Sequence, residues 1–125
     1  MLMKMKGRMI RDKMRYMSDT YNVMHIDDVP NDEGMFFEIV EYDEKPDLET
    51  MQSWTKSGTI EVLHVVHDGK ECHAIIDEEG KFDNSNKINK MATTKWNRWL
   101  RKTGRTAFGD MIVGKCSVLI NFELE

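Results

Sequence analysis

Alternation of apolar and polar positions predicts β-strands over much of the chain. Two runs rich in aromatic and β-branched residues, within residues 21–44, flank a Pro-Asn-Asp-Glu-Gly turn. Residues 59–67 and 70–77 have the same character on either side of Asp68-Gly69. This dipeptide is typical of two-residue hairpin turns, because Asp tolerates positive φ and Gly accepts it freely. The pattern therefore predicts two β-hairpins.

The short turn at Asp68-Gly69 also predicts which residues lie opposite each other in the second hairpin. We expect four cross-strand pairs: His67 with Lys70, Val66 with Glu71, Val65 with Cys72, and His64 with His73. Since side chains alternate between the faces of a strand, one face is apolar and is predicted to be the core side. Its members are Leu63, Val65, Cys72, Ala74 and Ile76.

Two segments have the pattern of helices. Residues 45–58 begin with Asp47 as the expected N-cap and end at Gly58, with Leu48 and Met51 in the buried stripe. Residues 85–104 form the clearest helix, with Ser85 or Asn86 as the expected cap and Gly104 as its end. The apolar positions of this second helix follow the helical period: Ile88, Met91, Ala92, Trp96, Trp99 and Leu100.

The two ends of the chain complete the predicted fold. Residues 1–17 resemble a basic amphipathic helix, and residues 110–124 resemble a long strand in which Gly114 marks a bulge or a close backbone approach. The predicted class is α+β: a small antiparallel sheet with two main helices packed on it and a basic N-terminal helical extension. The expected organisation is an extension over residues 1–17 and a single domain over residues 18–125.

The distribution of charge says more about partners than the net charge of −4 does. Residues 1–17 carry +5, residues 18–86 carry −14 and residues 87–125 carry +5. No run of apolar residues is long enough to span a membrane, and the charged N-terminus does not have the form of a secretory signal. With only two cysteines, Cys72 and Cys116, the chain has the composition of a reduced intracellular protein.

The second hairpin contains the only candidates for catalysis or metal binding. His64, His73 and Glu71 are expected on one strand face, where two imidazoles and a carboxylate are weak candidates for a zinc site without a closing ligand. Cys72 is a poor candidate for a nucleophile, because its apolar face would raise the pKa of the thiol. The sequence therefore favours a structural hairpin, no cofactor and a protein that is not an enzyme.

The helix over residues 85–104 is the best candidate for a binding surface. No acidic residue occurs between Asp83 and Asp110, and basic residues with two tryptophans suit phosphate contact together with base stacking. The ligand would be a nucleotide or single-stranded nucleic acid. The alternative is that the tryptophans belong to the core and the basic residues are a solvated face. The candidate ligand-binding residues are Lys87, Lys90, Lys95, Arg98, Arg101, Arg105, Trp96 and Trp99.

A second hypothesis uses the acidic residues of the 27–49 region. They would mimic nucleic acid or dock on a basic host protein, making the protein an inhibitor directed at another protein. The residues expected to form one acidic edge are Glu38, Glu41, Asp43, Glu44, Asp47 and Glu49. A homo-oligomer would suit either hypothesis, because small folds with exposed edge strands often pair.

Five short motifs occur in order along the chain. The motifs are a Leu-Gln helix ending at Gln52, the strand entry Gly58-Thr59-Ile60-Glu61, the turn 77–81 (DEEGK), Asn89 with Ala92-Thr93, and the segment 109–114 (GDMIVG). Together they resemble a domain family of unknown function found mainly in tailed phages and bacterial mobile elements, and the resemblance covers about residues 35–120. The chain departs from the family pattern at Ser57, at Thr59 and in the loop 82–88.

This resemblance implies an accessory protein made in the cytoplasm of an infected cell, near antirestriction genes. It implies no catalytic residue. Both the turn and the Asn-x-x-Ala-Thr segment are explained adequately as a turn and a helix cap.

Overall fold

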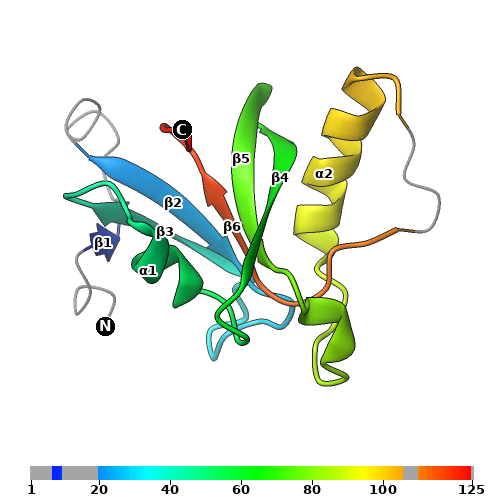
Figure 1. Ribbon diagram of the computed structural model, residues 1–125, viewed down its shortest axis with the longest axis horizontal. Coiled ribbons are helices and arrows are strands. Elements are labelled where there is room, and N and C mark those ends of the chain that lie inside the picture. The colour runs from blue at the N-terminus through cyan, green and yellow to red at the C-terminus, as the bar shows by residue number, and fades with distance from the viewer. Residues whose placement is uncertain (1–6, 10–19, 106–109, 125) are drawn as a thin grey trace.

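The structure is a computed structural model that describes residues 7–9, 20–105 and 110–124. Its centre is a six-stranded antiparallel sheet with the strand order β1-β3-β2-β6-β5-β4 (Figure 1). The strands are β1 (Gly7–Met9), β2 (Tyr21–Ile26), β3 (Phe37–Tyr42), β4 (Ile60–His67), β5 (Lys70–Asp77) and β6 (Cys116–Leu119). Two α-helices, α1 (Leu48–Gln52) and α2 (Lys90–Lys102), and a 3-10 helix, η3 (Gly80–Phe82), complete the described elements.

The predicted hairpins are confirmed. β2 pairs with β3 around the 27–36 loop, and β4 pairs with β5 with His64 opposite His73 and Val65 opposite Cys72. Asp68 and Gly69 have φ of 50° and 76°, the positive values that a tight two-residue turn requires. The turn therefore sets the register, as the sequence indicated.

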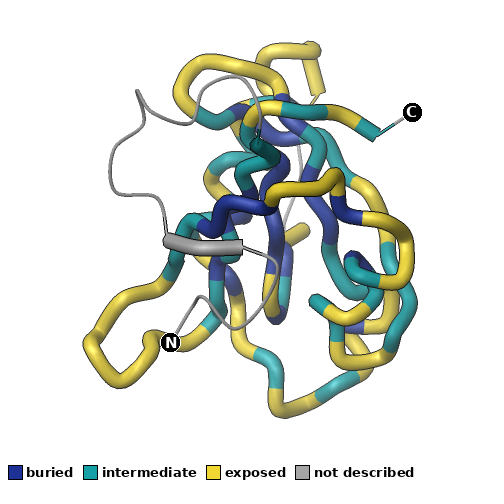
Figure 2. Tube along the Cα trace, turned by 90° about the vertical axis from the view of Figure 1, so that its left-hand side faces the viewer, coloured by how far each residue is buried: buried dark blue, intermediate teal, exposed yellow. Residues whose placement is uncertain are grey.

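The sheet is buried on both faces, because each face carries its own apolar cluster. One cluster contains Val65, Cys72 and Ala74 from the predicted core face, with Ala92 of α2 packed against them. The other contains Val23, Val40, Tyr42, Ile75 and Leu119 from the opposite face, with Met51 of α1. Figure 2 shows the buried residues concentrated along the central strands and the exposed residues in the loops.

The predicted fold class is wrong in its balance of helix and sheet. The molecule is mostly sheet and has one long helix, whereas we expected a small sheet with two main helices. α1 has only five residues and ends at Gln52, well before Gly58. Asp47 does cap it, accepting a hydrogen bond from the Thr50 amide, but Met51 is its only buried residue and Leu48 is 57% exposed. So little apolar surface cannot hold a longer helix against the sheet.

The predicted N-terminal helix is not shown either. Gly7–Met9 pairs with β3 as a strand, with Gly7 opposite Tyr42. Glycine is unfavourable in a helix interior by about 1 kcal/mol relative to alanine, which weakens the helical pattern at this point. The remainder of the predicted extension lies outside the described residues.

The C-terminal segment is a strand over only four residues, Cys116–Leu119, rather than over most of residues 110–124. Before it, Gly114 has φ of 79°, and a Cβ there would lie 3.1 Å from Cγ of Asn86. The predicted close approach at Gly114 is therefore confirmed, and the Asn86 side chain is the neighbour that lies against this backbone. Over the residues that the structure describes, no helix has the length and apolar character needed to cross a membrane.

Candidate functional site

Helix α2 presents a row of exposed cations to solvent. The row comprises Lys90, Arg98, Arg101 and Lys102, and we call it the basic face of α2. Among the described residues, none of the four has a carboxylate within ion-pair distance. Other lysines do have one: Lys56 lies 3.4 Å from Asp83, Lys81 contacts Asp110 and Lys115 lies 4.0 Å from Asp27. The positive charge of the basic face is thus not compensated locally within the described chain.

Two further basic residues of the predicted site make contacts elsewhere. Lys95 is half-buried, and its Nζ lies 2.9 Å from Nδ1 of His67 on β4. Burial lowers the pKa of Lys95. Arg105 lies just beyond the helix, with its guanidinium carbon 5.5 Å from the centre of the Trp99 ring. Lys95 therefore supports the packing of α2 on β4 and does not join the basic face.

The two tryptophans of the predicted site lie on the sheet side of α2. Trp96 packs against the core cluster that contains Val65 and Ala92. Trp99 stacks on His64 of the edge strand β4, with ring centres 5.1 Å apart and an angle of 18° between the planes. The structure thus does not bring either indole together with the basic face, and any phosphate contact there would be made without tryptophan stacking.

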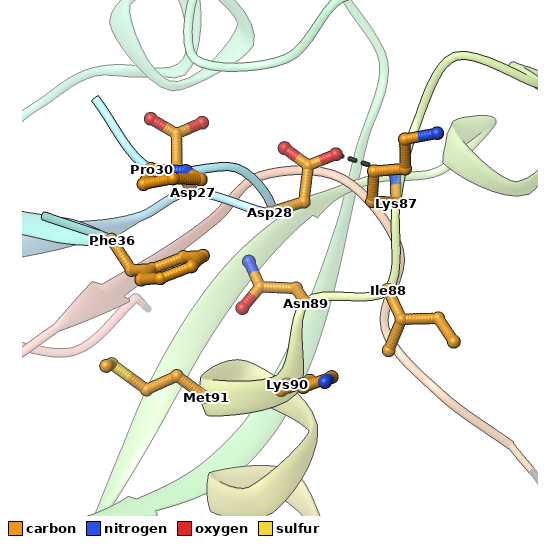
Figure 3. A pocket seen from close by; sticks show the side chains of 9 residues that line it. All are labelled: Asp27, Asp28, Pro30, Phe36, Lys87, Ile88, Asn89, Lys90 and Met91. Atoms are coloured by element: carbon orange, nitrogen blue, oxygen red, sulfur yellow. Dashed lines mark hydrogen bonds between the residues drawn. The ribbon is translucent and has the colours of Figure 1, made fainter. Parts of the chain in front are cut away.

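A pocket of about 460 Å³ opens at the N-terminal end of α2 (Figure 3). Its walls come from two segments far apart in sequence, the 27–36 loop and residues 87–91. The lining is mainly apolar, with two lysines and two aspartates among its members. The lining residues are Asp27, Asp28, Pro30, Phe36, Lys87, Ile88, Asn89, Lys90 and Met91.

Hydrogen bonds join the two walls of this pocket. The Lys87 amide donates to Oδ2 of Asp28 at 2.7 Å, and Nδ2 of Asn89 donates to the carbonyl oxygens of Ile26 at 3.1 Å and Gly114 at 2.8 Å. Oδ1 of Asn89 accepts from the Ala92 amide, so Asn89, rather than the predicted Ser85 or Asn86, is the N-cap of α2. The pocket is therefore held open by the fold itself.

The hairpin histidines form a packed pair. The rings of His64 and His73 lie 4.9 Å apart, Nδ1 of His64 lies 3.0 Å from Oε2 of Glu71, and Nδ1 of His73 accepts a hydrogen bond from the Leu124 amide. Within the described part of the chain, no three or more His, Cys, Asp or Glu side chains are grouped so that they could hold a metal ion.

Both thiols are buried, and Cys72 lies on the apolar core face that the sequence predicted. Burial raises the pKa of Cys72, and it raises the pKa of Cys116 to about 12. Thiols are nucleophilic as thiolates, so these cysteines are unreactive near neutral pH.

A polar chain that the sequence did not reveal crosses the α1 side of the sheet. Nδ1 of His25 lies 2.7 Å from Oγ of Ser117, and its Nε2 lies 3.0 Å from the Tyr42 hydroxyl. Burial lowers the pKa of His25 to about 4, with a further contribution from Lys115, so the imidazole is neutral near pH 7. Ser117 is only 3% exposed, which leaves a substrate no access to its hydroxyl.

The acidic residues of the alternative hypothesis are not all on one exposed edge. Glu41 is 0% exposed and Glu38 is half-buried, whereas Asp43, Glu44, Asp47 and Glu49 are exposed, and Asp47 also caps α1. The structure thus brings only part of the expected set to the surface.

Sequence reasoning missed most of the pocket, because its walls meet only in the folded chain. Ile88 is 43% exposed, although it belongs to the apolar positions of the predicted helix, and Phe36 is 44% exposed in a run that predicted a strand. In the sequence, the only hint is an apolar Met-Phe-Phe run directly after the turn glycine Gly34.

Comparison with known proteins does not identify a family or a function for this chain. The chain matches no family model, no curated protein and no solved structure. The family resemblance of the five motifs therefore stays an expectation.

Proposed function

We propose that the protein is a non-enzymatic binder of an anionic partner, either single-stranded nucleic acid or a nucleotide, and that it binds through the basic face of α2. The observation that carries the proposal is the row of exposed cations that make no ion pair with any described residue, in a protein whose net charge is −4. An acidic protein with a local basic face attracts anions to that face.

The position of Lys90 supports a role in binding rather than in stability. A lysine in the first turn of a helix faces the positive end of the helix dipole, which costs about 0.3–1 kcal/mol. The first turn of α2 has no acidic residue to offset this cost. Arg101 and Lys102, in the last turn, have a favourable dipole interaction, so their presence is explained by helix stability as well.

In its biological setting, this binder would act in the cytoplasm of an infected cell, as the resemblance implies, by sequestering a nucleic acid or a nucleotide signal and so countering a host defence. A homo-oligomer would present several basic faces to one strand and raise the avidity.

Charge reversal on the basic face tests the proposal. Arg98→Glu with Arg101→Glu should abolish binding to a fluorescein-labelled single strand, measured by fluorescence anisotropy, while circular dichroism shows an intact fold. Both side chains are exposed, so the replacements remove no core contact.

Two controls make the test specific. Arg98→Lys with Arg101→Lys keeps the charge and should keep most of the binding. Lys45→Glu changes an exposed residue next to α1 and should have little effect. If the double reversal binds as well as the wild type, the proposal is wrong. Loss of function in an infection assay after charge reversal at Asp43, Glu44 and Glu49 would then favour the acidic hypothesis.

A further inference from the structure

We propose that the pocket at the N-terminal end of α2 holds one nucleotide unit, with the base between Phe36 and Ile88 and the phosphate at Lys87 and Lys90. The inference rests on the proposed function, since it names the place where the anionic partner is recognised by more than its charge.

The size and construction of the pocket fit a small ligand. Its volume of about 460 Å³ lies within the range of about 300–1,000 Å³ that small-molecule sites occupy. The hydrogen bonds from Lys87 to Asp28 and from Asn89 to Ile26 fix both walls before any ligand arrives. A preformed site does not lose affinity to the ordering of loops on binding.

The apolar walls fit a flat heterocycle. In Figure 3 the Phe36 ring and the Ile88 side chain lie on either side of Asn89, and all three line the pocket. Both residues are more than two-fifths exposed, an unusual placement for large apolar side chains that lie together at one pocket. A base inserted between them would cover both surfaces, and stacking on an aromatic ring accepts any of the common bases.

The charges at the opening select an anion. Asp27 is paired with Lys115 at 4.0 Å, and Asp28 accepts the Lys87 backbone amide. Neither Lys87 nor Lys90 has an ion pair within the described ranges, so two ammonium groups stand against one carboxylate, that of Asp28, and leave a net positive charge for a ligand. A base with a phosphate meets the apolar walls and these two ammonium groups together, whereas an uncharged apolar compound would leave the lysines unused.

The pocket also joins the basic face of α2 through Lys90, which belongs to both. A strand that ends in the pocket can continue along Arg98 and Arg101, and a free mononucleotide can fill the pocket alone. A strand end and a free mononucleotide both offer a base and a phosphate, and an experiment can distinguish these two ligands.

A comparison of a base-bearing strand with an abasic strand of the same length and charge tests the inference. The wild type should bind the base-bearing strand about tenfold more tightly, as expected for one stacked base. Phe36→Ala should remove this preference and leave abasic binding unchanged. Phe82→Ala is the matched control, because Phe82 is an 84% exposed phenylalanine outside the pocket, and it should keep the preference.

Amide NMR spectra identify the source of the nucleotide. If a nucleoside 5′-monophosphate shifts the signals of Ile88 and Asn89 and ribose 5-phosphate does not, the pocket accepts the free nucleotide. If only a strand shifts them, the pocket holds a strand end. Equal binding of both strands by the wild type, or a loss of both in Phe36→Ala, would overturn the inference. Binding that still required Arg98 and Arg101 would then leave the proposed function standing, whereas no binding to either strand or to the nucleoside 5′-monophosphate would contradict both.

Discussion

Nδ2 of Asn89 donates a hydrogen bond to the carbonyl oxygen of Gly114 at 2.8 Å, and this bond ties the start of α2 to the segment that leads into β6. The same amide group donates to Ile26 at the end of β2, and Oδ1 caps the helix. One buried side chain thus joins three segments and sets the position of the basic face and the pocket.

Substitution of Asn89 should therefore be among the most destabilising polar changes in the chain. Asn89→Ala removes the cap and the two hydrogen bonds that Nδ2 donates to the carbonyl oxygens of Ile26 and Gly114, so we expect a loss of about 2–4 kcal/mol in the free energy of unfolding. Urea denaturation measures it. Asn89→Asp keeps the capping oxygen but puts a carboxylate against both carbonyls, and it should also be strongly destabilising. A loss below about 1 kcal/mol in both variants would contradict this account.

Lys90 offers a prediction in which stability and binding move in opposite directions. Lys90→Glu places an acid in the first turn of α2 and should raise the free energy of unfolding by about 0.3–1 kcal/mol, while weakening the binding of a single strand. Thermal denaturation and anisotropy measure the two effects.

The matched control for Lys90 is Lys102→Glu, which makes the same charge change in the last turn. It should lower stability by a similar amount, because the acid then faces the negative end of the helix dipole. If both variants shift stability in the same direction, net charge and not position is responsible, and the argument from the helix dipole fails.

His25 should make stability depend on pH. Its pKa is about 4 in the folded chain and near 6.5 when unfolded, so the unfolded state takes up a proton first as the pH falls. The stabilisation is complete above pH 6.5 and is lost progressively towards pH 4, by up to about 3 kcal/mol.

The comparison with His25→Gln isolates this contribution from that of the carboxylates. The difference in free energy of unfolding between wild type and variant should change between pH 6.5 and pH 4 and stay constant above pH 7. Parallel curves over the whole range would show that the His25 imidazole is not held neutral by the fold.

Metal removal should not affect the hairpin. His64 and His73 supply two imidazoles, and Nδ1 of His73 already accepts the Leu124 amide. We expect the melting temperature of zinc-exposed wild type to be the same before and after addition of a chelator. The His64→Ala variant should likewise show no change on chelation. A clear fall on chelation in the wild type alone would reveal a metal site.

Local signals predicted the pairing within the two hairpins, because the residues that decide it are neighbours in the sequence. The pairing of β6 with β2 and β5, and of β1 with β3, was not predicted. Asp68 and Gly69 fix the β4–β5 register, and alternation along both strands identifies the face that packs against α2. The helical period likewise predicted the buried stripe of α2, in which Ala92 and Leu100 are buried.

The features that the sequence did not predict depend on contacts between distant segments. Trp54 was expected to extend α1, but it packs against His25 and Tyr42, with ring centres 4.8 and 5.9 Å away, and the helix ends before it. The pocket needs the 27–36 loop to meet residues 87–91, and periodicity along one segment carries no information about that meeting. Trp96 and Trp99 were placed in a binding site by their proximity to arginines in the sequence, whereas helical geometry separates them from the basic face.

The salt dependence of binding tests the central claim most directly. Each phosphate that a cation neutralises on a single strand contributes a slope of about −0.7 to the logarithm of the association constant against the logarithm of salt concentration. If the basic face binds the strand, Arg98→Gln with Arg101→Gln should reduce the magnitude of the slope by about 1.4, whereas Lys45→Gln should leave it unchanged. A slope near zero in the wild type, or an equal slope in wild type and double variant, would contradict the claim that these cations contact phosphate.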